Sequence, residues 1–174
     1  GKHGGCGCSV IYRDSWERIR RSGDETCPPG SLIKVGILVT VFDLVAKGQL
    51  SLDDPITPLK IDQVPGSGVA QYFHNGTILT VRDAAYLMMT ISDNTATNLL
   101  LDRIIIRRMW AKMDSLGLHN TKVHSKSFLR ISSVAMDSSV KYELGVTTPN
   151  EMAHLFELLT QRRAAHPAAE STMP

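Results

Sequence analysis

The run from Leu32 to Ala46 constrains the fold more than any other feature of this chain. Its apolar residues occupy the whole circumference of a helix, at positions 32, 33, 35, 37, 38, 39, 41, 42, 44, 45 and 46. A helix that is apolar all round is buried on every side. Many of these residues are β-branched and would also suit a strand, but the run is too long for one. We therefore expect a central helix that other elements surround, ending at Lys47-Gly48.

Further helices are predicted from their N-terminal signals. Thr80 followed by Asp83 is a weaker relative of the capping box, and residues 148–151 (Thr-Pro-Asn-Glu) combine a cap, an early proline and a glutamate. Asp93 or Asn94 can cap another helix, which carries leucines up to Ile104. The middle of the chain is therefore predicted to be predominantly α-helical.

The chain has 174 residues, which is enough for one domain with a real core. We divide it into a poorly defined segment 1–30 with short strands, a helical region 31–160 and an irregular tail 161–174. Residues 119–146 carry few helix or strand signals and are predicted to be mostly loop.

Composition excludes several classes of function. The net charge is +2 and no long basic run occurs, so no nucleic-acid partner is expected. No stretch of eighteen apolar residues is present, so no membrane span is expected, and the first residues lack the apolar region of a signal peptide.

Metal and disulfide chemistry are not predicted. Cys6, Cys8 and Cys27 are an odd number near the N terminus, and His3 with two of them lacks a fourth ligand. Glu151 and His154 lie one helical turn apart, but no second such pair exists. We expect no metal and no cofactor.

Ser31 and Lys34 are the first candidate catalytic residues. On a helix, positions i and i+3 share a face, so Lys34 Nζ is expected to reach Ser31 Oγ. A serine is a weak nucleophile until a neighbour takes its proton, and burial beside apolar residues favours the neutral lysine that can do so. The N terminus of the helix also offers a backbone N–H to an oxyanion. An ordinary N-cap role for Ser31 is the alternative.

The spacing alone is weak evidence, because Ser138 and Lys141 repeat it without an apolar helix behind them. The tripeptide Ser92-Asp93-Asn94, which lies between two predicted helices, strengthens the interpretation. Its alternative role is a helix–helix turn with an Asp or Asn cap.

These motifs resemble those of the penicillin-recognising serine hydrolases, most closely the class A β-lactamases, whose signature set is S-x-x-K, S-D-N and K-T-G. The resemblance covers residues 31–160 and rests on these stretches, in order: Ser31–Lys34, Leu52–Ile56, Leu79–Asp83, Ser92–Leu101, Met113–Leu118 and Thr147–Met152. It implies an α+β fold of the β-lactamase/transpeptidase-like type, of which this chain supplies mostly the helical domain, with few short strands.

By resemblance, Ser31 is the acylated nucleophile and Lys34 its proton-handling partner. Ser92 resembles the hydroxyl that relays a proton to the leaving nitrogen. Asn94 resembles the amide that holds both Lys34 and the substrate's acylamide, while Asp93 braces the turn. The implied partner is a small β-lactam or peptidoglycan-like substrate, and the implied location is periplasmic or secreted.

Two departures from the family pattern affect the expected activity. No Lys-Thr-Gly follows Asn94, and in the family this motif lies on the strand that supplies a second oxyanion N–H. We therefore expect a truncated family member with impaired activity. Because most of the sheet would also be missing, we expect an apolar face of the helical domain to be uncovered. The family's deacylating glutamate, with an asparagine downstream, has no match in residues 119–146, where Glu143 is a stand-in or simply a solvated acid.

Three functions follow from these observations. The first is a β-lactamase-like serine hydrolase acylated at Ser31. The second is an esterase or a DD-peptidase and penicillin-binding protein on the same scaffold, because S-x-x-K does not choose between amide, ester and lactam. The third is a non-catalytic helical module that buries its apolar face against a partner or a second copy.

Overall fold

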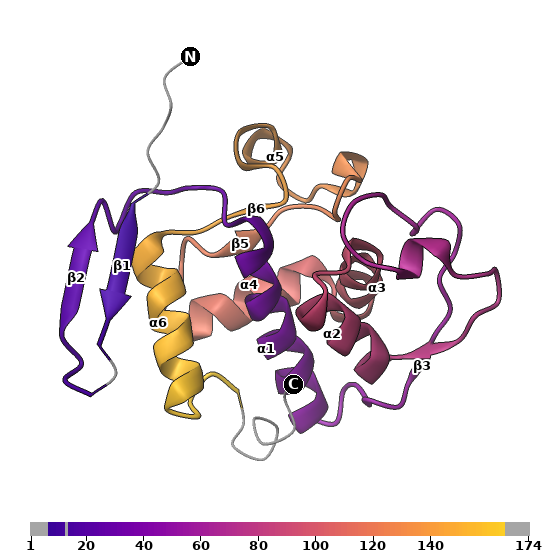
Figure 1. Ribbon diagram of the computed structural model, residues 1–174, viewed down its shortest axis with the longest axis horizontal. Helices are drawn as coiled ribbons and strands as arrows, with labels where there is room; N and C mark the ends of the chain where they lie inside the picture. The colour runs from indigo at the N-terminus through magenta and orange to yellow at the C-terminus, as the bar shows by residue number, and fades with distance from the viewer. Residues whose placement is uncertain (1–6, 13, 166–174) are drawn as a thin grey trace.

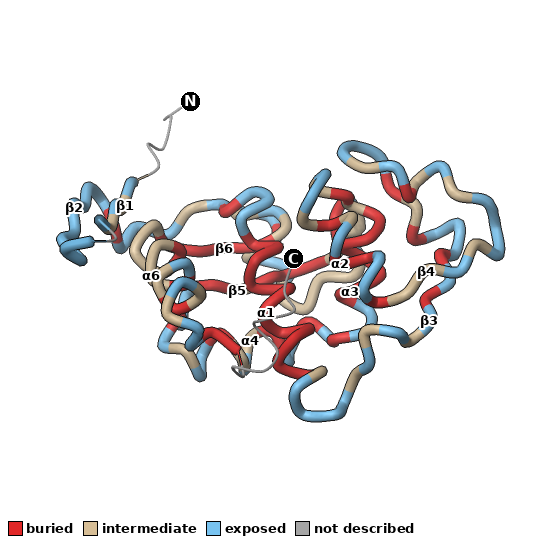
Figure 2. Tube along the Cα trace, turned by 60° about the horizontal axis from the view of Figure 1, so that its bottom comes forward, coloured by how far each residue is buried: buried red, intermediate tan, exposed pale blue. Residues whose placement is uncertain are grey.

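The computed structural model describes residues 7–12 and 14–165. Helix α1 (Ile33–Ala46) lies at its centre, and every residue from Ile33 to Leu44 is buried. Figure 2 shows this helix red between its neighbours. The prediction of a central, fully buried helix is confirmed. A single 3₁₀ turn, Gly30–Leu32, leads into it.

Five further helices surround α1 in the described part of the chain: α2 (Val81–Thr90), α3 (Asn94–Ile104), α4 (Ile106–Ser115), α5 (Met136–Tyr142) and α6 (Pro149–Thr160). Helices α2, α3 and α4 pack directly on α1, and α6 adds Met152, Leu155 and Leu158 to the same core. Figure 1 shows α6 on one side of α1 and the α2–α3 pair on the other.

The predicted helix starts are confirmed, because the side chains that cap them form the expected hydrogen bonds. Thr80 and Asp83 make a complete capping box at α2. Asp93 caps α3 by accepting from the backbone N–H of Ala96 at 2.9 Å. Thr148 Oγ accepts from the N–H of Glu151 at 3.2 Å, so α6 begins where the sequence predicts.

Within the residues that the structure describes, the strands form three short antiparallel pairs: β1 (Cys8–Ile11) with β2 (Arg18–Arg21), β3 (Pro55–Ile56) with β4 (Leu79–Thr80), and β5 (Lys122–Val123) with β6 (Gly145–Val146). The β1–β2 hairpin confirms the short strands expected in segment 1–30. It packs against α6 through β1 (Figure 1).

The prediction that residues 119–146 are mostly loop is wrong in part, because they contain β5, α5 and both residues of β6. Helix α5 is short and has no side-chain cap, so it gives little sequence signal. Strands β5 and β6 have two residues each and exist because they pair across a long separation in sequence, which a local pattern does not reveal.

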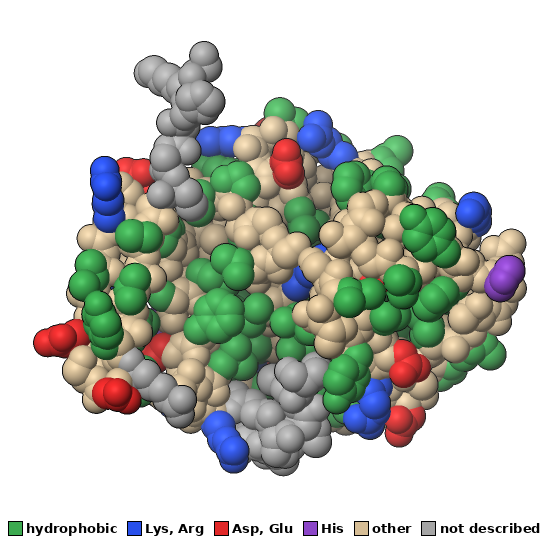
Figure 3. Space-filling view, in the orientation of Figure 1, with side chains coloured by type: hydrophobic (Ala, Val, Ile, Leu, Met, Phe, Trp, Pro, Cys, Tyr) green, Lys and Arg blue, Asp and Glu red, His purple; other side chains and the backbone are tan. Residues whose placement is uncertain are grey.

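An apolar hollow of about 350 Å³ lies between β1 and α6, lined in part by Val10, Trp16 and Phe156. These side chains remain 41–45% exposed. In Figure 3, hydrophobic side chains gather on the surface over the hairpin and α6. In the described ranges, no helix is long and apolar enough to cross a bilayer.

We expect Gly145→Ala to lower the free energy of unfolding by about 1–3 kcal/mol, because a methyl group there would lie 2.6 Å from the backbone oxygen of Lys122. Gly36→Ala is the matched control, since its methyl group would meet the tip of the flexible Met109 side chain and would favour the helix. Urea denaturation measures both. Equal destabilisation by the two variants would contradict the close β5–β6 approach.

Candidate active site

Ser31 lies in the 3₁₀ turn immediately before α1 and is exposed. The preceding Gly30 has a left-handed backbone (φ 56°), which a glycine adopts without strain and which turns the chain into the helix. The first N–H groups of a helix have no intrahelical acceptor. The hydroxyl of Ser31 thus sits beside backbone donors at the positive end of a buried helix.

Lys34 is one of the most buried polar residues of the protein, with 2% of its surface exposed. Its Nζ donates to the carbonyl oxygen of Ser92 at 2.6 Å, to Ser92 Oγ at 2.8 Å and to Asn94 Oδ1 at 3.0 Å. All three acceptors lie at the junction of α2 and α3. An ammonium group has three donors, so these bonds satisfy it completely.

Ser92 joins the lysine to the first serine, because its Oγ donates to Ser31 Oγ at 2.9 Å. The i, i+3 spacing predicted a direct contact between Lys34 Nζ and Ser31 Oγ. Instead, the described hydrogen bonds of Lys34 go to the α2–α3 turn, and the path to Ser31 passes through Ser92 Oγ. The structure thus brings together Ser31, Lys34, Ser92 and Asn94.

Burial changes the acid–base behaviour of Lys34. Desolvation disfavours the ammonium form and lowers the pKa of Lys34 from 10.5 to about 8, although the negative charge of Asp93 opposes this shift. A fraction of the amine is therefore neutral near physiological pH, and a neutral amine can accept a proton.

The turn that carries Ser92 is held by Asp93, whose side chain is fully buried. Besides capping α3, its carboxylate accepts from the backbone N–H groups of Val69 at 2.7 Å and Ala70 at 2.9 Å. Gly68 packs so closely that a methyl group there would lie 2.2 Å from the carboxyl carbon of Asp93. The predicted bracing role of Asp93 agrees with these contacts, which hold Ser92 in a left-handed conformation (φ 57°).

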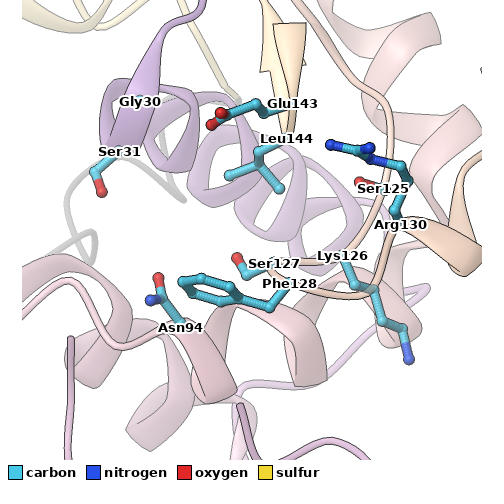
Figure 4. A pocket seen from close by; sticks show the side chains of 10 residues that line it. All are labelled: Gly30, Ser31, Asn94, Ser125, Lys126, Ser127, Phe128, Arg130, Glu143 and Leu144. Carbon is cyan, nitrogen blue, oxygen red and sulfur yellow. The ribbon is translucent and has the colours of Figure 1, made fainter. Parts of the chain in front are cut away.

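A pocket of about 550 Å³ opens in front of Ser31. Figure 4 shows the ten residues that line it: Gly30, Ser31, Asn94, Ser125, Lys126, Ser127, Phe128, Arg130, Glu143 and Leu144. Ser31 and Asn94 face the cavity from opposite ends of one wall, and the carboxylate of Glu143 also turns into it (Figure 4). Ser138, the serine of the second S-x-x-K match, is not among the residues that line this pocket.

Sequence reasoning missed the wall formed by residues 125–130 and the residue that fixes it. Asn98 is fully buried on α3, accepts from the N–H of Ser127 at 2.7 Å and donates to its carbonyl oxygen at 3.1 Å. The available signal was an asparagine one helical turn after Asn94 on an otherwise apolar helix face.

In the described ranges, no group of three or more His, Cys, Asp or Glu side chains is arranged to hold a metal ion. Glu151, half of the rejected metal pair, accepts hydrogen bonds from Asn120 and Thr121. It therefore joins α6 to the segment before β5.

The fold, with this cluster at the start of its central helix, places the protein in the β-lactamase/transpeptidase-like class. A sequence model of the β-lactamase enzyme family matches residues 1–173, and the chain belongs to this family. The β-lactamase BRO-1 of Moraxella catarrhalis is 32% identical over 96 residues, which are 55% of this chain and 31% of that protein.

Solved structures agree with this assignment. The β-lactamase of Sphaerobacter thermophilus is 29% identical with a TM-score of 0.83, over 96% of this chain and 60% of that one. A mutant of PBP-A, described as an acyl-enzyme complex with penicillin G, is 27% identical with a TM-score of 0.81, over 95% of this chain and 59% of that one. The chain therefore spans about three fifths of these relatives.

We expect Asp93→Ala to lower the free energy of unfolding by about 3 kcal/mol or more, because it leaves three backbone N–H groups without their acceptor at about 1–3 kcal/mol each. Asp53→Ala is the control, since that side chain is exposed and its ion pair with Arg82 is weak at 3.6 Å. Denaturant unfolding measures both. A loss for Asp93→Ala no larger than the control's would contradict the bracing role.

The lowered pKa of Lys34 also predicts how stability depends on pH. Between about pH 8 and 10.5 the unfolded chain holds a proton on Lys34 that the folded chain has released, so the free energy of unfolding rises with pH in this window. The rise is at most about 1.4 kcal/mol per pH unit. We expect it to disappear in Lys34→Met, measured as the difference between the two proteins' stability profiles. Parallel profiles would show that the pKa is not lowered.

Proposed function

We propose that this member of the β-lactamase family is a serine hydrolase that β-lactams or related amides and esters acylate at Ser31. The observation that supports this most is the hydrogen-bonded path from Ser31 Oγ through Ser92 Oγ to the buried Lys34 amine. It supplies both a nucleophile and a route for its proton, which an acyl transfer requires.

In the proposed acylation, neutral Lys34 takes a proton from Ser92 while Ser92 takes the proton of Ser31. The Ser31 oxygen forms a bond to the substrate carbonyl carbon, and the backbone N–H of Ser31 stabilises the resulting oxyanion. When the carbon–nitrogen bond breaks, the ammonium of Lys34 returns the proton through Ser92 to the leaving nitrogen. The step thus ends with Ser31 acylated, the leaving nitrogen protonated, the Ser92 hydroxyl intact and Lys34 neutral.

Asn94 is proposed to contact both the catalytic lysine and the substrate. Its Oδ1 accepts from Lys34, and its Nδ2 donates to the backbone oxygen of Pro65 at 3.3 Å. Because Asn94 also lines the pocket, this weak second bond is one that a substrate acylamide can replace. A donor held at the pocket surface orients the carbonyl next to the nucleophile.

Glu143 is the proposed base for release of the acyl group. Among the described residues that line the pocket it is the one with a carboxylate, and that carboxylate turns into the cavity (Figure 4). A carboxylate that can reach the attacking water contributes to hydrolysis by taking its proton.

The alternative on the same scaffold is a penicillin-binding protein or DD-peptidase, in which the acyl group stays on the serine for longer. The similarity to PBP-A, whose mutant is described as an acyl-enzyme complex with penicillin G, supports this second candidate. Both candidates share the acylation step and a small β-lactam or peptidoglycan-like substrate. We propose a periplasmic or secreted location for either one.

We expect a fluorescent penicillin to label the protein and Ser31→Ala to abolish the labelling, because that substitution removes the nucleophile. The rate of labelling should rise with pH through about 8, following the neutral fraction of Lys34. Gel fluorescence and intact mass measure the adduct. Ser138→Ala is the matched control and keeps full labelling.

Labelling that persists in Ser31→Ala would refute the assignment of the nucleophile. Absence of labelling in the folded wild-type protein would refute the acylation itself and favour the non-catalytic alternative. Hydrolysis of a chromogenic cephalosporin then separates β-lactamase activity from penicillin binding.

A further inference from the structure

Arg130 carries a positive charge on the wall of the pocket, and the proposed acylation does not use it. It lines the same cavity as Ser31. Figure 4 shows its side chain reaching toward Glu143 and Leu144, across the cavity from Ser31. Within the described ranges, its guanidinium forms no hydrogen bond or ion pair, not even with the carboxylate of Glu143. The pocket therefore holds a cation whose charge no described residue neutralises.

Lys126, the second cation among the described residues that line the pocket, is already engaged. Its Nζ donates to Asp102 Oδ2 at 2.6 Å and lies 3.6 Å from Asp62 Oδ1. Its side chain is turned away from the cavity (Figure 4). Of these two cations, Arg130 is therefore the one that can bind an anionic group in the pocket.

The backbone that carries Arg130 is held by its own segment. Arg130 begins a 3₁₀ turn that ends at Ser132. The hydroxyl of Ser132 accepts from the N–H of Lys126 at 2.8 Å and donates to the carbonyl oxygen of Leu129 at 2.6 Å. Because these bonds close the segment on itself, a ligand that binds the guanidinium does not have to order the backbone.

Phe128 lies on the same wall and has two unusual properties. Its side chain is 67% exposed, and its backbone is left-handed (φ 57°), which is rare for a bulky residue. A methyl group on Gly66 would lie 3.4 Å from the Phe128 ring and 2.8 Å from Asn94 Nδ2, so the ring lies close to this amide. Strain of this kind is concentrated at functional sites.

We propose that Arg130 is a specificity-determining residue, whose guanidinium binds a carboxylate at the end of the substrate's acyl side chain. This inference rests on the proposed function. With the acylamide at Asn94, the side chain runs along the wall, contacts the ring of Phe128 and ends at Arg130. A guanidinium binds a carboxylate through two parallel hydrogen bonds. The substrate class is therefore β-lactams and related acyl donors with an anionic acyl side chain.

The charge of Glu143 makes this assignment specific. Its carboxylate faces the same cavity (Figure 4) and repels an anionic ligand. Without Arg130, the pocket therefore disfavours a carboxylate. Removal of the guanidinium should abolish the preference completely rather than weaken it.

The test compares two penicillins that differ in one group: a glutaryl side chain with a free carboxylate, and the same chain with a terminal amide. Intact mass measures the second-order rate of acylation of the whole chain by each. In the wild type we expect the carboxylate form to react about fivefold faster, the effect of one partly exposed ion pair. The ratio of the two rates is insensitive to general changes in reactivity, and the carboxylate of the penicillin nucleus is common to both.

Three variants separate the charge from its surroundings. Arg130→Gln should lower the ratio to one or below, whereas Arg130→Lys keeps the charge without the planar fork and should retain a smaller preference. Arg20→Gln is the matched control, because it removes an arginine from an exposed strand outside the pocket and should keep the wild-type ratio. Phe128→Ala should slow both penicillins, since the ring contacts the part of the chain that they share.

Several results would overturn the inference while acylation at Ser31 stands. These are equal rates for the two penicillins in the wild type, a ratio that Arg130→Gln leaves unchanged, and an equal loss of preference in Arg20→Gln. Equal slowing of both penicillins by Arg130→Gln would place the carboxylate of the nucleus at Arg130 instead. Unchanged rates in Phe128→Ala would show that the side chain does not follow this wall. Failure of the wild type to react with either penicillin refutes the proposed function and this inference together.

Discussion

The hydrogen bonding of one buried ammonium group determines how the candidate site is built. Lys34 lies in a helix that is otherwise buried in apolar surroundings, so its charge is stable there only if all three donors find acceptors. Those acceptors are the backbone oxygen and hydroxyl of Ser92 and the amide of Asn94. The α2–α3 turn must therefore dock at this point on α1. The same burial lowers the pKa of the lysine, so the constraint on folding and the reactivity have one cause.

For Lys34 to find these acceptors, the α2–α3 turn must keep one conformation, and several contacts hold it in place. Ser92 has a left-handed backbone, which costs free energy for a residue other than glycine. Asp93 compensates with three backbone hydrogen bonds that join α3 to the loop at Val69 and Ala70. The loop approaches closely because Gly68 has no side chain. A strained residue held by a buried carboxylate is thus the structural basis for the position of the Ser92 hydroxyl.

The sequence predicts what depends on local chemistry and misses what depends on contacts between distant segments. The apolar circumference of α1 and the caps at Thr80, Asp93 and Thr148 are local, and their helices are confirmed. The spacing of Ser31 and Lys34 suggested direct contact, but the acceptors of the lysine come from residues 58 and 60 positions away. The wall at 125–130 was unpredictable for the same reason, because a side chain on α3 fixes it rather than its own sequence pattern.

Helix α3 holds two separate parts of the candidate site through one of its faces. Asn94, at its first residue, accepts a hydrogen bond from Lys34, whereas Asn98 holds the backbone of Ser127 in the pocket wall. Because the clamp binds only the backbone of Ser127, it places whatever side chain occupies that position without depending on its identity. The wall can therefore change its chemistry while the lysine, the two serines and their hydrogen bonds stay intact.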